Sequence, residues 1–82
     1  MIFNVQIKVM LLKDLLDPQG KAVQSSLQNL DIHSVTDVRI GKHITLQVEA
    51  ASEEAAKTIA EATCKKLLAN PVMEYYEIEM VN

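Results

Sequence analysis

Apolar and polar residues alternate in four short stretches of the chain, and each stretch predicts a β-strand with one buried face. The four stretches are residues 3–9, 37–40, 44–49 and 75–80. Gly41 and Lys42 lie between the second stretch and His43, which begins the third strand, and a two-residue link with glycine first is typical of a type II′ hairpin turn. The pattern therefore predicts four strands, two of them joined in a hairpin.

Two other stretches repeat apolar residues at helical spacing, and each begins with a capping residue. The first predicted helix covers roughly residues 18–30, because Asp17 suits the N-cap position and Pro18 suits the first helical position. The second predicted helix opens with Ser52 as its N-cap and stops before Asn70 and Pro71. The apolar stripe of this second helix consists of Ala56, Ile59, Ala60, Thr63 and Leu67.

The elements follow one another in the order β-α-β-β-α-β, which we assign to a single domain of residues 1–82. A chain with this order forms an α+β sandwich of two layers with ferredoxin-like topology, in which a four-stranded antiparallel sheet carries both helices on one face. The sheet face below the helices is expected to hold Val5, Ile7, Val38, Ile40, Ile44, Leu46, Val48, Ile78 and Met80.

Composition narrows the class of protein. Hydrophobic residues make up 49% of the 82 positions and charged residues 23%, which is typical of a globular domain. The net charge of −3 has the wrong sign for a general nucleic-acid binder. A small domain without disulfide or metal often gains stability by oligomerising, so we expect a homodimer or a higher homo-oligomer. The first residues form neither a signal peptide nor a membrane span, and we therefore expect a cytoplasmic protein.

Residues that could carry catalysis or hold a cofactor are scarce. Cys64 is the single cysteine, and we interpret it as a small buried apolar residue. His33 and His43 have no carboxylate or second histidine at ligand spacing. Gly20 and Gly41 are the only glycines, which leaves no glycine-rich phosphate loop. We therefore expect no catalytic residue, no metal site and no cofactor site in this chain.

Three surface features instead indicate a binding or assembly role. The turn that begins at Asp17 exposes helix N–H groups to an anion or a partner's carbonyl, although a capped helix start also explains it. Arg39 and Lys42 place two cations beside the predicted hairpin turn. Such a pair suits binding to a phosphate or to a partner's acidic patch, and an ordinary exposed hairpin explains it equally well. A leucine-rich cluster after the first strand marks an interface. The candidate partner interface is Leu11, Leu12, Leu15, Leu16, Asp17, Pro18, Gln19, Gly20, Arg39, Gly41 and Lys42.

Three motifs together resemble one protein family. The motifs are LDPQG at residues 16–20, DVRIGK at residues 37–42 and CKKLLANPVME at residues 64–74. In this order and at this chain length they resemble the PurS family, the small subunit of the bacterial phosphoribosylformylglycinamidine synthase complex.

The resemblance implies a place in purine biosynthesis. The complex converts formylglycinamide ribonucleotide, glutamine and ATP into formylglycinamidine ribonucleotide, glutamate, ADP and phosphate. The resemblance implies that a large synthetase subunit (PurL) uses ATP and Mg²⁺, and that a glutaminase subunit (PurQ) releases ammonia. The small subunit is then a dimer that joins the two and supports ammonia transfer, with no catalytic residue of its own.

Two other functions share the predicted order of elements. A stand-alone regulatory domain that binds a small molecule would use the loop after the first strand, and the turn at residues 17–20 suits that role. An RNA-binding module needs aromatic residues for stacking on its open sheet face. Tyr75 is the only exposed candidate there, and the negative net charge adds to the objection.

Overall fold

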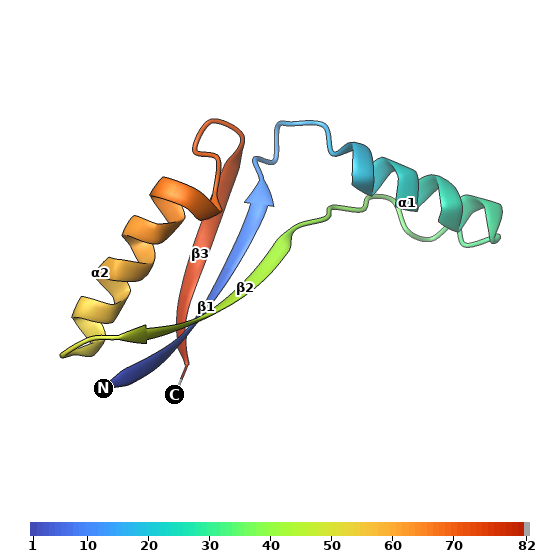
Figure 1. Ribbon diagram of the computed structural model, residues 1–82. Coiled ribbons are helices and arrows are strands. Elements are labelled where there is room, and N and C mark those ends of the chain that lie inside the picture. Colours follow the sequence, from blue (N-terminus) through green and yellow to red (C-terminus); the bar gives the residue numbers. More distant parts are fainter. Residues whose placement is uncertain (82) are drawn as a thin grey trace.

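The computed structural model describes residues 1–81 and shows a small antiparallel sheet with one helix packed on it and a second helix projecting away from it (Figure 1). The elements are β1 (Ile2–Leu11), α1 (Pro18–Asn29), β2 (Lys42–Glu49), α2 (Glu53–Thr63), the π-helical turn η1 (Cys64–Leu68) and β3 (Glu74–Val81). Asn82, the last residue of the predicted domain, lies outside the described residues.

β1 is the central strand of a sheet with the order β2-β1-β3, and it pairs antiparallel with both neighbours. The register places Ile7 opposite both Ile44 and Ile78. Directly opposed residues share one face of a sheet, so the apolar positions of the three strands form one continuous apolar surface. The strands predicted at residues 3–9, 44–49 and 75–80 are confirmed.

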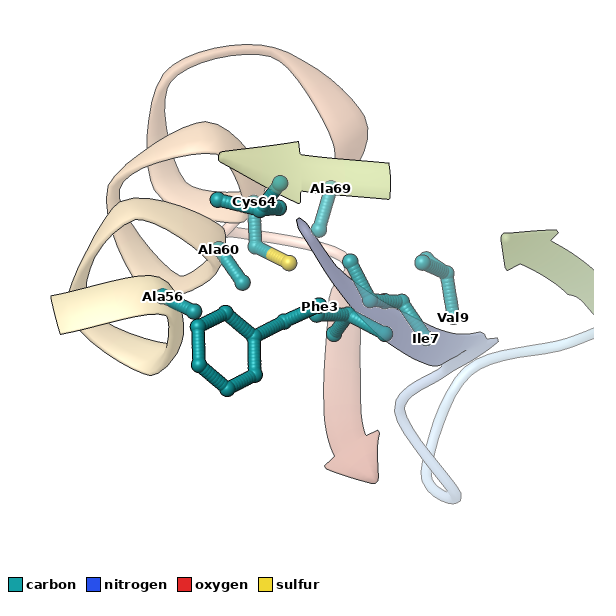
Figure 2. Packing of buried hydrophobic residues seen from close by; sticks show 9 residues of the cluster. Phe3, Ile7, Val9, Ala56, Ala60, Cys64 and Ala69 are labelled. Carbon is teal, nitrogen blue, oxygen red and sulfur yellow. The ribbon is translucent and has the colours of Figure 1, made fainter. Parts of the chain in front are cut away.

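α2 covers this apolar face through small side chains, as Figure 2 shows. Ala56, Ala60 and Cys64 follow one another at intervals of four residues and are fully buried. The capping prediction is confirmed, because Oγ of Ser52 accepts a hydrogen bond from the backbone N–H of Ala55 at 3.1 Å. The predicted apolar stripe was only partly right. Two of its members are exposed: Ile59 at 44% and Leu67 at 80%.

Cys64 lies at the junction of α2 and η1, with its side chain in the core. Burial raises the pKa of its thiol, and the charge of Glu61 raises this pKa further. A buried thiol of this kind is unreactive. The prediction that Cys64 is a small apolar core residue is confirmed.

The prediction of a four-stranded sheet was wrong, because residues 37–40 form no strand. Among the described residues no glycine has a positive φ, so the type II′ turn that requires one at Gly41 is absent. Gly41 lies instead against β1, where a Cβ atom would come within 2.6 Å of the carbonyl oxygen of Val9. Residues 37–40 therefore approach β2 from the direction of α1 instead of running back along it, and Val38 and Ile40 do not join the core.

α1 forms as predicted but lies away from the sheet. Its C-terminus closes in a Schellman motif, in which Asp31 adopts a φ of 61° and the N–H of Ile32 donates to the carbonyl of Leu27 at 2.9 Å. Within residues 1–81, α1 makes no extensive contact with any strand or with α2 (Figure 1). Placing both helices on one sheet face was therefore wrong.

The molecule is consequently elongated. Its radius of gyration is 16.3 Å and its longest extent 52 Å, whereas a compact chain of this length has a radius of gyration of about 12 Å. We call residues 12–41, which comprise α1 and its two connecting segments, the arm. The rest of the chain, with the sheet and α2, is the body.

Candidate functional site

Most residues of the predicted partner interface come together where the arm leaves the body. Both connecting segments of the arm pass through this region, one entering α1 and one returning to β2 (Figure 1). We call it the joint and define it by residues 12–17, Gly20 and residues 38–40. Two side chains, those of Asp17 and Arg39, connect the segments across it.

Asp17 bonds to both segments with one carboxylate. Oδ1 accepts a hydrogen bond from the N–H of Gly20 at 3.0 Å, which caps α1. Oδ2 accepts a second bond from the N–H of Ile40 at 2.7 Å, which holds the returning segment. Asp17 is only 6% exposed and is the one buried polar residue in the described part of the chain.

The surroundings of Asp17 favour its charged form. The backbone hydrogen bond from Ile40 is the largest cause of a lowered pKa, followed by the bond from Gly20, and the charge of Arg39 adds to the effect. Burial opposes the shift but does not reverse it. Asp17 is therefore an ionised structural acceptor at neutral pH, because both of its strong hydrogen bonds stabilise the carboxylate.

Gly20 lets α1 approach the returning segment closely. A Cβ atom at this position would lie 1.9 Å from the carbonyl oxygen of Val38, a separation that no side chain tolerates. The backbone of the first turn of α1 therefore packs directly on the backbone of Val38. This close contact explains the glycine three residues after the capping aspartate.

Arg39 connects the same two segments on the other side of the joint. Its Nη1 donates to the carbonyl oxygens of Leu15 at 3.0 Å and Leu12 at 3.4 Å, and its Nη2 donates to that of Lys13. The planar guanidinium group suits such a cluster of acceptors, because its donors have a fixed geometry. Arg39 also forms an ion pair with the exposed Asp37 at 3.8 Å. Much of its hydrogen-bonding capacity is thus used within the chain.

The other predicted interface residues lie within the joint or beside it. Leu16 is 71% exposed, Pro18 and Gln19 are exposed, and Leu11 and Leu15 are half-buried. Lys42 has a separate partner, since its Nζ donates to the carbonyl oxygen of Leu68 in η1 at 3.4 Å. That these residues contact a partner remains a prediction.

Sequence reasoning identified Asp17, Gly20 and Arg39 but missed what connects them. The carbonyl groups of residues 12, 13 and 15 and the backbone of Val38 complete the joint. The amino-acid composition does not indicate which backbone carbonyl groups accept such bonds. The single available signal was the spacing of Gly20 three residues after Asp17, which we interpreted only as a turn.

The surface beside the joint is hollowed but carries mixed charge. The hollow has a volume of about 310 Å³, and Lys13, Lys21 and Arg39 line it together with Asp14 and Asp37. Because both cations and acids line it, the hollow favours neither an anion nor a cation. Within residues 1–81, no three His, Cys, Asp or Glu side chains are grouped so that they could hold a metal ion.

The helices of the described chain are too short or too polar to cross a membrane.

Comparison with known proteins identifies the family. The model of the family described as PurS, phosphoribosylformylglycinamidine (FGAM) synthase, matches residues 4–82, almost the entire chain. The chain belongs to the PurS family. It is 45% identical over 78 residues to the PurS subunit of phosphoribosylformylglycinamidine synthase from Synechocystis, covering 95% of this chain and 78% of that one. It is 40% identical over 79 residues to the subunit from Bacillus subtilis, covering 96% and 93% of the two chains.

Solved PurS structures share the fold. A chain in the structure of PurLQS from Thermotoga maritima matches with a TM-score of 0.91 at 34% identity, covering 99% of both chains. The crystal structure of B. subtilis PurS matches with a TM-score of 0.88 at 40% identity, covering 98% of this chain and 99% of that one. The PurS resemblance found in the sequence motifs is therefore confirmed over almost the whole chain.

Proposed function

We propose that this chain is the assembly subunit of an FGAM synthase of purine biosynthesis, and that it holds a glutaminase subunit and an ATP-dependent synthetase subunit together. The match that carries the proposal is the one to the PurLQS structure, which spans nearly the full length of both chains. The family assignment favours this role over a free-standing regulatory domain.

The proposed role is non-catalytic. ATP and Mg²⁺ belong to the large subunit in this proposal, and this chain takes part in the reaction only as an obligatory subunit in the cytoplasm. Its contribution is to keep two active sites in fixed relation. Ammonia released at one site then reaches the other without diffusing into solvent, because an enclosed interface excludes water and a fixed geometry raises the effective concentration.

The proposed function includes a homodimer formed through the arm. Val23 on α1 is 39% exposed, and Leu30, which caps the C-terminus of α1, is 69% exposed, so the helix presents apolar surface to solvent. Ile44 and Leu46 on β2 are only partly buried, because α2 alone covers the apolar sheet face. In the proposed dimer, α1 of a second copy covers the part of the apolar sheet face that α2 leaves open, and its apolar residues suit that contact.

Reconstitution tests the assembly role. Large and glutaminase subunits are purified from the same organism and assayed with glutamine or with ammonia as nitrogen donor, with and without this chain. Glutamine-dependent activity is expected only when the chain is present, whereas ammonia-dependent activity persists without it. Glutamine-dependent activity that is unaffected by the chain, without co-elution with either subunit, would contradict the proposal.

A matched pair of variants tests the predicted interface in the same assay. Leu16→Asp introduces a charge at a residue that is 71% exposed, so it leaves the fold intact while weakening a partner contact. Thr45→Asp introduces the same charge at an exposed position of β2 on the opposite, polar sheet face. Glutamine-dependent activity is expected to fall in L16D and not in T45D. Equal activities would remove Leu16 from the interface.

A further inference from the structure

The chain between α1 and β2 has two ways to use the same backbone groups. In a two-residue hairpin around Gly41 and Lys42, Ile40 and His43 would flank the turn and exchange hydrogen bonds. In the structure the N–H of Ile40 donates to Asp17 at 2.7 Å instead. The bond to Asp17 therefore occupies the N–H group of Ile40, which the hairpin requires as a donor.

Arg39 acts against the hairpin from the neighbouring position. Its guanidinium group is bound to the carbonyls of residues 12, 13 and 15, so the returning segment is tied to the segment that enters α1. A hairpin would carry residues 37–40 back along β2 and away from these carbonyls. The alternating pattern of residues 37–40 nevertheless suits a strand, so the closed form is available to this sequence once the joint is released.

We propose that Asp17 and Arg39 are positioning residues that hold the arm open and thereby present α1 to a second copy of the chain. This inference rests on the proposed dimer. With the joint formed, α1 points away from the body (Figure 1). With the joint released, residues 37–40 add a fourth strand to the sheet and α1 folds beside α2 of its own chain, which removes the surface that a second copy would bind.

Distance measurements within one chain test the proposal directly. Spin labels are attached to Gln28→Cys on α1 and Lys57→Cys on α2, both at exposed positions. The two helices lie at opposite ends of the molecule (Figure 1). Buried Cys64 stays unlabelled. Labelled chains are diluted with an excess of unlabelled chains, so that pulsed electron paramagnetic resonance reports only the distance within a chain.

Asp17→Asn is the decisive variant, because the amide keeps the size of the carboxylate and loses one of its two acceptor atoms. Asp14→Asn is the matched control, an exposed acid three residues earlier. We expect a single long distance in the parent chain and in D14N, and an additional shorter distance in D17N. An unchanged single long distance in D17N would overturn the role of Asp17.

Arg39→Gln provides the second test from the other side of the joint, with Asp37→Asn as its control. D37N removes only the ion pair of Arg39, whereas R39Q removes the bonds to the three carbonyls. We expect the shorter distance in R39Q and not in D37N. Circular dichroism of each variant checks that the body remains folded, and a folded R39Q with the parent distance would overturn the role of Arg39.

Light scattering on the same samples separates this inference from the proposed dimer. A parent chain that is dimeric, with D17N and R39Q shifted towards monomer, supports both. A parent chain that is monomeric with a long, single distance would refute the dimer while leaving the joint in place.

Discussion

At the scale of single residues, Asp17 shows how one side chain serves two elements. As a helix cap it needs only one acceptor atom, and a serine or asparagine would serve as well. The structure uses the second oxygen as well, for the N–H of Ile40, 23 positions away. The carboxylate thus converts a local capping signal into a tertiary contact.

The lowered pKa of Asp17 makes its contribution to stability depend on pH. A carboxyl group with a lower pKa in the folded state stabilises that state at pH values above its ordinary pKa of 3.8. This stabilisation is lost as the pH falls below 3.8 towards the lowered value of the folded state. Urea denaturation should therefore show the parent chain more stable than D17N at neutral pH, with the difference closing under acid conditions. D14N is the control, and a difference between parent and D17N that is independent of pH would contradict the prediction.

At the scale of elements, the body depends on how closely α2 lies on the sheet. Ala56 and Ala60 face the central strand, where Val5 and Ile7 are fully buried. Small side chains on the helix leave room for the branched side chains of β1, and the interface is filled without voids when large and small residues alternate across it.

Ala60→Leu is expected to destabilise the body by about 1–3 kcal/mol, because the added side chain has no space and must push α2 off β1. Ala62→Leu is the matched control, since Ala62 is exposed on the same helix and leucine is nearly as good a helix former as alanine. Urea denaturation at one fixed chain concentration measures both variants. Equal stabilities of A60L and A62L would show that the contact is looser than described.

At the scale of the whole molecule, the shape is unusual for so short a chain. Its extents are 52 × 27 × 14 Å, and its arm exposes apolar side chains, among them Leu16 and Leu30 at about 70%. Large exposed apolar surfaces on small proteins mark interaction sites. The elongation and the exposed side chains have the same explanation if the arm is covered by another copy.

Val23→Glu tests this explanation, because it places a charge on the apolar side of α1 at a partly exposed position. An unpaired glutamate charge is costly to bury in an apolar interface, so the dissociation constant of the dimer should rise about tenfold or more. Ser25→Glu, at an exposed position on the same helix, is the matched control. Sedimentation at a series of concentrations measures both, and equal dissociation constants would place the dimer interface elsewhere.

Local features of this protein could be predicted from the sequence because they depend on neighbours along the chain. Three strands follow from period-two alternation, and both helices follow from their spacing and from the caps at Asp17 and Ser52. The burial of Cys64 follows from its place on the apolar side of a helix. Family membership could be recognised for a similar reason, since its motifs are short and continuous.

The tertiary structure alone decided where residues 37–40 and α1 go. The apolar and polar pattern of residues 37–40 suits a strand, and the pattern of α1 suits a packed helix. Both patterns are compatible with the closed and with the open form, so periodicity does not distinguish these two forms. The difference lies in hydrogen bonds between positions far apart, from Ile40 to Asp17 and from Arg39 to the carbonyls of residues 12–15. The sequence by itself thus determined the two helices and three of the strands, whereas competition for a few backbone groups in three dimensions decided that residues 37–40 form no strand and that the arm stays open.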